Sequence, residues 1–157
     1  MEDCLFCGIV AGKIPSHKIW EDDNYIAFLT IFPNTDGFTV VATKEHTDSD
    51  AFQKDDKTLA GIVLAAKKVA KLLVKAFDDV GRAGMFIEGY GVNHLHVKLF
   101  PMHGTPKTGM WQAHDSSGEI TSKYFEKYEG YLSSHNGNRM DDEKLAKIAQ
   151  KIRSVVE

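Results

Sequence analysis

Residues 91–101 read GVNHLHVKLFP, and polar and apolar side chains alternate through the middle of this stretch. Successive side chains of a β-strand point to opposite faces of the sheet. The pattern therefore predicts a strand over 92–100 that projects His94, His96 and Lys98 together from one face. The apolar residues between them are expected to face the core.

Two imidazoles and one ammonium on the same face can organise a phosphate group. A neutral imidazole acts as a nucleophile toward phosphorus, and the cation offsets the charge of the non-bridging oxygens. The preceding residues, Glu88-Gly89-Tyr90-Gly91, favour this interpretation because glycines let backbone amides approach an anion closely. The alternative is an ordinary strand whose polar face lies in water.

The two cysteines of the chain, Cys4 and Cys7, form a C-x-x-C pair. The two cysteines are too close in sequence for a disulfide between them to crosslink a domain, as disulfides do in small secreted proteins. The pair fits half of a zinc site, a redox pair or two inert cysteines. Redox pairs of this spacing normally open a helix within a βαβ unit, whereas strands and turns are expected to follow here. A zinc site would need two further ligands.

Short β-prone runs alternate with turn residues in much of the chain. Five strands are expected, over 18–20, 25–31, 38–42, 85–87 and 92–100. The first three favour an antiparallel meander, and Gly89-Tyr90-Gly91 supplies the turn between the last two. Between residues 56 and 77, apolar positions recur with helical spacing while lysines take the other face, which predicts one long amphipathic helix.

After Pro101 the sequence becomes polar and contains glycines. The expected elements there are a loop over 103–118, a helix over 120–132, a second loop over 133–140 and a final helix from 141 onward. The chain shows no linker or internal repeat. Strands followed by segregated helices favour a single α+β domain over 1–157, with a core over 4–104 and a C-terminal helical extension over 105–157.

The composition is that of a globular protein, with 43% hydrophobic and 26% charged residues. A formal charge of -3 offers no bulk positive field, which argues against duplex nucleic acid as a main partner. The sequence contains neither a secretory signal pattern nor an apolar run long enough to span a membrane. We therefore expect a cytoplasmic protein with no membrane partner.

Three stretches resemble the histidine triad (HIT) family. His94-Leu95-His96-Val97-Lys98-Leu99-Phe100 is similar to the family's HxHxHxx motif, with Lys98 in place of the third histidine. Residues 6–15, FCGIVAGKIP, and the WEDD at 20–23 resemble its N-terminal signature, and residues 37–46 resemble its G-hTLVhPKxH strand. The similarity covers residues 4–104.

The resemblance implies an α+β, HIT-like fold with a five-stranded antiparallel sheet and one long helix, in a two-fold homodimer. It also implies that a purine nucleotide or nucleotide conjugate binds over the triad strand. His96 would attack the α-phosphorus, expel the other half and leave a nucleotidyl-histidine for water or another acceptor to resolve. The residues expected to bind the nucleotide are Phe6, Ile9, Phe28, Thr30, Ile31, Glu88, Gly89, Gly91, Val92 and Asn93.

Some HIT-like proteins bind a structural zinc ion through two cysteines and two histidines. By that resemblance, the zinc ligands here are Cys4, Cys7, His46 and His94. A closed Cys2His2 sphere leaves no open position, so the metal would pin the N-terminal segment to the triad strand without activating water. His94 would then face the metal and His96 the phosphate.

Three positions depart from the family pattern. Lys98 can hold a phosphate oxygen as a point charge, but it shuttles a proton near neutral pH only if its pKa is depressed. Protonation of the leaving group then passes to His103, for which the alternative is an exposed loop residue. Thr30 offers a single hydroxyl where many members place an aspartate for the ribose. Glu88 replaces a common asparagine, and its carboxylate would repel phosphates unless it meets a ribose hydroxyl or Lys98.

Three functions are consistent with these residues. The favoured one is a nucleotide phosphohydrolase that cleaves a phosphoramidate, a dinucleoside polyphosphate or a related conjugate through His96. A nucleotidyltransferase would use the same intermediate and hand it to an acceptor. The third is a non-catalytic nucleotide-binding protein, which the departures at Lys98 and Thr30 leave open.

Overall fold

The computed structural model describes residues 4–108, together with Lys127 and Glu143. The chain divides into two compact units, residues 1–110 and 111–157, and the helices and strands below belong to the first. The loops and helices expected after residue 108 lie outside the described residues. The extent of the domain, expected to be 1–157, therefore stays a prediction.

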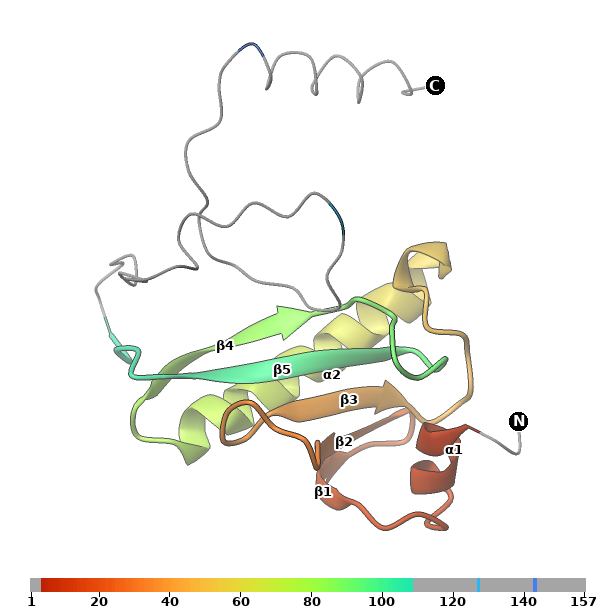
Figure 1. Ribbon diagram of the computed structural model, residues 1–157, viewed down its shortest axis with the longest axis horizontal. Helices are drawn as coiled ribbons and strands as arrows, with labels where there is room; N and C mark the ends of the chain where they lie inside the picture. The colour runs from red at the N-terminus through yellow and green to blue at the C-terminus, as the bar shows by residue number, and fades with distance from the viewer. Residues whose placement is uncertain (1–3, 109–126, 128–142, 144–157) are drawn as a thin grey trace. The chain divides into compact units, whose positions relative to one another are not determined.

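One antiparallel sheet forms the framework of this unit, with strand order β1-β2-β3-β5-β4 (Figure 1). The strands are β1 His17–Glu21, β2 Tyr25–Leu29, β3 Thr39–Thr43, β4 Val80–Phe86 and β5 His96–His103. The first three strands form the expected meander. The five-stranded antiparallel sheet confirms the α+β fold prediction.

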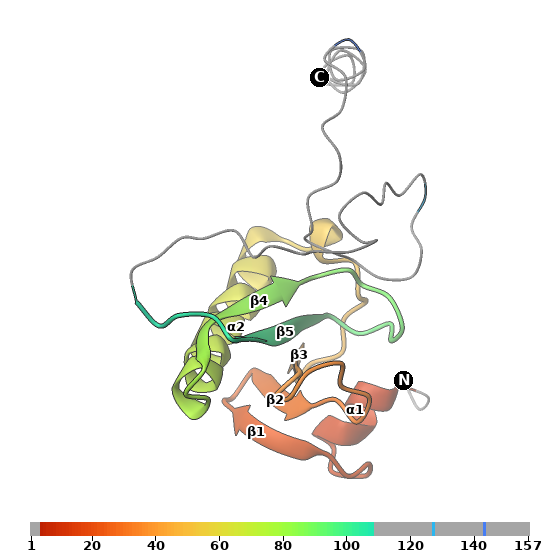
Figure 2. The same ribbon diagram turned by 60° about the vertical axis from the view of Figure 1, so that its left-hand side comes forward.

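A long helix, α2 (Asp56–Ala76), covers one face of the sheet (Figure 2). The helix begins after Asp55, whose carboxylate accepts a hydrogen bond from the Thr58 amide at 3.0 Å and so caps the first turn. The helix packs against β2, β3, β4 and β5. The buried residues of this core are Ala27, Val41, Ala51, Ile62, Ala65, Ala66, Val69, Leu73, Leu95, Val97 and Leu99. The expected helix is confirmed almost to the residue.

The opposite face of the sheet carries a short helix, α1 (Leu5–Val10), which the sequence analysis did not predict. Phe6 on this helix is buried against Ile26, Phe28 and Val40 of the sheet. The expectation that strands and turns follow the cysteine pair is therefore wrong. The helix does not belong to a βαβ unit, however, because every strand pairing in the sheet is antiparallel.

The last two strands differ from their predicted bounds. β4 starts at Val80 and includes Gly81 and Gly84, which were expected to precede it. β5 starts at His96 and continues through Pro101, where the predicted strand had already ended. β3 pairs with β5 only as far as Leu99, so the missing amide of Pro101 interrupts no pairing with β3.

A 3-10 turn, η1 (Ala51–Gln53), connects the segment after β3 to α2. Within the part of the chain that the structure describes, no helix has both the length and the apolar character needed to cross a membrane.

Candidate active site and metal centre

His96 opens β5 on the sheet face away from α2. Its cross-strand neighbour is Ala42, and the ring of Phe6 meets the imidazole edge-to-face at 5.2 Å. The side chain is 3% exposed. Nδ1 lies 2.7 Å from the His94 carbonyl oxygen, and since a carbonyl only accepts, Nδ1 carries the proton. This bond leaves the Nε2 lone pair unprotonated, and burial lowers the pKa of the imidazole. The His96 ring is therefore held in one orientation, with its unprotonated nitrogen Nε2 turned away from the His94 carbonyl.

His94 lies just before β5 and not within it, which corrects the expected strand over 92–100. Its amide donates to the Val92 carbonyl at 2.8 Å, a tight turn that takes the backbone out of the extended conformation. The ring is fully buried, and Nε2 donates to the Thr43 carbonyl at 2.7 Å. Nδ1 is then the unprotonated nitrogen, and it faces the sulfurs of Cys4 and Cys7. Strand alternation is thus not what orients this side chain.

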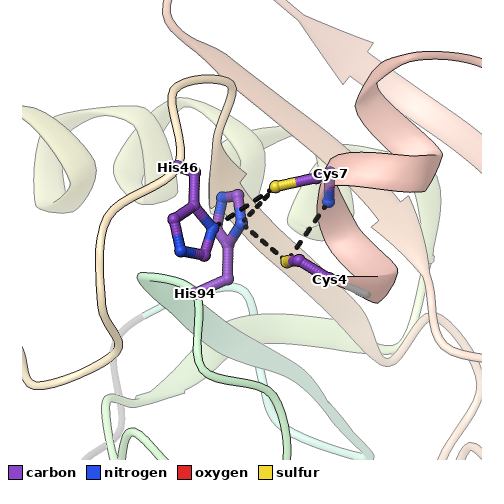
Figure 3. Close-up of side chains that lie close together, drawn as sticks. All are labelled: Cys4, Cys7, His46 and His94. Atoms are coloured by element: carbon purple, nitrogen blue, oxygen red, sulfur yellow. Dashed lines mark hydrogen bonds between the residues drawn. The ribbon is translucent and has the colours of Figure 1, made fainter. Parts of the chain in front are cut away.

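Four potential metal ligands converge beside His94 (Figure 3). The Nδ1 atom of His94 lies 3.4 Å from Cys4 Sγ and 3.6 Å from Cys7 Sγ. Cys7 Sγ also lies 3.3 Å from His46 Nδ1, and all four ligand atoms are within 4.8 Å of one another. Tetrahedral zinc, with Zn–S of about 2.3 Å and Zn–N of about 2.05 Å, places sulfur and nitrogen about 3.6 Å apart. The four side chains therefore fit a tetrahedral zinc ion.

Helix α1 presents the two cysteines to this cluster. Cys4 caps the helix, and its Sγ accepts a hydrogen bond from the Cys7 amide at 3.5 Å. Burial raises the pKa of the Cys7 thiol, and the adjoining Cys4 raises it further. A divalent cation would reverse this effect, because metal binding deprotonates a coordinating thiol.

The loop between β4 and β5 is fastened to the segment after β3. Ser49 Oγ donates to the Gly89 carbonyl at 2.6 Å, and the Ser49 amide donates to Asn93 Oδ1 at 3.0 Å. Gly89 and Gly91 have φ angles of 69° and 93°, in the left-handed region that favours glycine. A Cβ on Gly89 would lie 2.8 Å from the Ser49 carbonyl oxygen, whereas one on Gly91 would meet nothing within 4 Å.

The segment 43–49 therefore binds both the His94 ring and the loop between β4 and β5. Thr43 binds the His94 ring, the Thr47 carbonyl accepts from the Leu95 amide at 2.9 Å, and Ser49 fixes the glycine loop. Sequence reasoning missed Thr43 and Ser49. A buried threonine at the end of a strand is a weak signal for the first, and the sequence gives no signal for the second.

Lys98 projects from β5 on the same face as His96, and Glu88 reaches it from the end of β4. The two side chains form an ion pair, with 27% and 12% of their side-chain surfaces exposed. Burial lowers the pKa of the Lys98 ammonium, while the neighbouring carboxylate favours its charged form. Glu88 therefore meets Lys98, one of the two partners expected to offset its charge near phosphates.

The apolar residues expected to bind the nucleotide divide into two groups. Phe6 and Phe28 are buried and pack edge-to-face at 5.4 Å, with Ile9 and Val92 partly buried in the same apolar cluster. Ile31 lies in the loop after β2 and is 72% exposed. In the same loop, Thr30 Oγ1 accepts a hydrogen bond from the Phe32 amide at 3.2 Å.

His103 ends β5, seven residues after His96, which corresponds to about 23 Å along an extended strand. Its Nδ1 lies 3.1 Å from both carboxylate oxygens of Asp79, and its Nε2 donates to the Asp36 carbonyl at 3.0 Å. The structure therefore does not bring His103 to His96. Its partners tie together three turns at the opposite end of the strand.

The sheet, the long helix on one face and the histidines at the start of a central strand define the class of protein: a small α+β domain with a cluster of histidines and cysteines on the sheet face opposite α2. A family model for the HIT domain matches residues 11–105, more than half of the chain. The chain belongs to the HIT family.

Relatives extend this similarity to named proteins. An adenosine 5′-monophosphoramidase of Schizosaccharomyces pombe is 34% identical over 98 residues, which cover 62% of this chain and 73% of that protein. The crystal structure of SMU.412c from Streptococcus mutans has 30% identity and a TM-score of 0.66, covering 100% of this chain and 87% of that one. A zinc-bound HIT family protein of Mycobacterium smegmatis has 27% identity and a TM-score of 0.60, covering 73% and 85%.

Proposed function

We propose that this protein is a nucleotide phosphohydrolase that uses His96 as its nucleophile. The observation that carries the proposal is the bond between His96 Nδ1 and the His94 carbonyl, which leaves Nε2 free to attack. Lys98 stands on the same face and supplies a positive charge for phosphate oxygens. The name of the Schizosaccharomyces pombe relative, a phosphoramidase acting on an adenosine monophosphate derivative, supports the substrate class.

The proposed reaction has two steps. The Nε2 lone pair of His96 forms a bond to the α-phosphorus, and the bond from phosphorus to the rest of the conjugate breaks with its electron pair leaving on that half. Water then attacks the nucleotidyl-imidazole, and the phosphorus–nitrogen bond breaks to restore the neutral ring. The glycine loop at Gly89 and Gly91 is assigned to the phosphates, and the cluster around Phe6 and Phe28 to a purine base.

An acid quench tests this proposal. The full-length protein is mixed with radiolabelled adenosine 5′-phosphoramidate and, separately, with diadenosine tetraphosphate, and then searched for an acid-labile nucleotidyl adduct. His96→Ala should abolish the adduct and the turnover, whereas His17→Ala, an exposed histidine on β1, should keep both. Equal turnover by His96→Ala contradicts the proposal. Release of the nucleotide only when an alcohol or phosphate acceptor is added would identify a nucleotidyltransferase.

We also propose that Cys4, Cys7, His46 and His94 hold a structural zinc ion. The tetrahedral spacing of their ligand atoms supports this, as does the zinc-bound relative from Mycobacterium smegmatis. When bound, zinc would crosslink α1 to the segment after β3 and to the start of β5. Protein purified without added zinc should contain about one ion per chain. A Cys4→Ser/Cys7→Ser variant that keeps a full complement of zinc would contradict the ligand set.

The proposal includes a homodimer and a cytoplasmic location. Cytoplasmic thiols are kept reduced, which is the state that a Cys2His2 zinc site requires. Sedimentation equilibrium of the zinc-loaded protein measures the mass directly. A mass of one chain at micromolar concentration would contradict the dimer.

A further inference from the structure

Among the residues that the structure describes, Lys98 has an apolar partner on each neighbouring strand and forms an ion pair with Glu88. Its partners across the sheet are Val40 on β3 and Phe86 on β4, and Phe86 in turn packs edge-to-face on Phe100 at 5.1 Å. Phe100 follows two positions later on the same face of β5. The Lys98 side chain thus lies between His96 and Phe100 on the same face of β5. Its ammonium is in contact with the Glu88 carboxylate.

Burial lowers the pKa of the Lys98 ammonium, but the Glu88 carboxylate in contact with it opposes that effect and favours the charged form. An ordinary lysine has a pKa of about 10.4, and an ordinary histidine has one of about 6.5. The imidazolium is therefore the stronger acid by about four pKa units, and the better proton donor to a departing group. Lys98 offers a fixed charge and holds its proton tightly.

Nucleotide conjugates fall into two chemical classes, according to whether the leaving group must be protonated as it departs. When a phosphoanhydride is cleaved, the departing phosphate is a stable anion that needs no proton. When a phosphoramidate is cleaved, the departing nitrogen must be protonated, because an amide anion is far too basic to leave. Positive charge alone assists the first reaction, and the second also requires an acid.

From this pairing we propose that Lys98 and Glu88 make the site selective for conjugates joined to the α-phosphate by an anhydride oxygen. The inference rests on the proposed function and names its substrate class. His96 Nε2 bonds to the α-phosphorus, the bridging oxygen departs with the electron pair as a phosphate or polyphosphate anion, and the Lys98 proton stays on Nζ. Water then displaces the imidazole, and the proton of that water passes to solvent.

The pair of residues also explains why Glu88 is tolerated beside phosphates. A carboxylate there would oppose an incoming anion, but in contact with Lys98 its charge is already compensated. Lys98 and Glu88, two of the three departures from the family pattern, thus act as one unit.

The test compares kcat/KM for diadenosine tetraphosphate and adenosine 5′-phosphoramidate, which share the adenylyl half. The wild-type protein should prefer the anhydride by about 100-fold or more, the smaller end of what general acid catalysis contributes. Lys98→His/Glu88→Asn should narrow this preference by about tenfold or more near pH 6.5, where an imidazolium is populated. Lys67→Gln, which removes an exposed lysine on α2, should keep the wild-type ratio.

Two results would overturn the inference while leaving the proposed function intact. One is wild-type cleavage of the phosphoramidate as fast as the anhydride, and the other is a double variant that changes both substrates by the same factor. Turnover of neither substrate, with no adduct on His96, would overturn both proposals together.

A second measurement needs no variant. Aryl esters of adenosine monophosphate should be cleaved more slowly as the phenol becomes more basic, by about tenfold or more between 4-nitrophenol and phenol. A rate independent of phenol acidity, with the nucleotidyl-transfer step rate-limiting in a burst experiment, would show that a proton is supplied and would overturn the inference.

Discussion

Substituting alanine at Gly89 tests whether Ser49 fixes the loop between β4 and β5. Both Gly89 and Gly91 adopt positive φ, so an alanine at either position costs about 1–2 kcal/mol of unfolding free energy. At Gly89 the new Cβ would also lie 2.8 Å from the Ser49 carbonyl oxygen, whereas at Gly91 it would enter open space. Displacing Ser49 removes its hydrogen bond to the Gly89 carbonyl, with a net cost of about 1 kcal/mol.

We therefore expect Gly89→Ala to cost about 2–3 kcal/mol and Gly91→Ala about 1–2 kcal/mol. Replacing glycine by alanine also lowers the conformational entropy of the unfolded chain, which stabilises the folded protein. This effect is the same for both variants and cancels in the comparison. Urea unfolding of zinc-loaded protein, followed by far-ultraviolet circular dichroism, measures both values. Ser49→Ala should cost about 1 kcal/mol in the wild-type background and close to nothing in Gly89→Ala. Equal losses for the two glycine variants would refute the argument that Ser49 holds this loop.

Two further predictions concern the rest of the fold. The Asp36 carbonyl and the Asp79 carboxylate raise the pKa of His103 in the folded protein. These contacts therefore stabilise the fold fully below the ordinary histidine pKa of about 6.5, and the stabilisation is lost as pH rises through the raised pKa. The loss of unfolding free energy in His103→Gln should therefore be larger at about pH 5.5 than at about pH 8.5, and a loss independent of pH would contradict this. On α2, Ile62→Ala should cost about 2–5 kcal/mol because Ile62 is fully buried. Leu64→Ala on its exposed side should stay within about 0.5 kcal/mol, and similar urea midpoints for the two would contradict the packing described.

The sheet and the long helix could be predicted because their signals are repeated along the chain. Turn residues separate the β-prone runs, and α2 shows the apolar spacing of a helix over many turns. Helix α1 has only six residues and is capped by Cys4, which is not one of the usual capping residues. Its apolar positions Phe6, Ile9 and Val10 follow helical spacing, and this was the one signal that could have revealed it.

The site could be predicted as a set of residues but not as an arrangement. Alternation correctly placed His96 and Lys98 on one face, because both lie within β5. His94 lies on that side of the sheet as well, where Phe6 contacts its ring at 5.8 Å, but a turn before the strand and a bond to Thr43 set its direction. His103 is close to the motif in sequence, but an extended strand carries it away from His96 at more than 3 Å per residue. Contacts from Ser49 depend on tertiary structure, which no local pattern encodes.

The segment 43–49 has an unusual consequence for how the chain can change in length. An ordinary surface connection accepts an inserted residue for a fraction of a kcal/mol. This one carries His46 between Thr43 and Ser49, and each of the three is bound to, or poised beside, a different part of the site. If one residue were added between His46 and Ser49, the two side chains could no longer both reach their present partners. Insertions should therefore be accepted far more readily in the turn between β1 and β2, which bonds to this segment through the Asn24 carbonyl and the Lys44 amide but binds neither His94 nor the loop between β4 and β5.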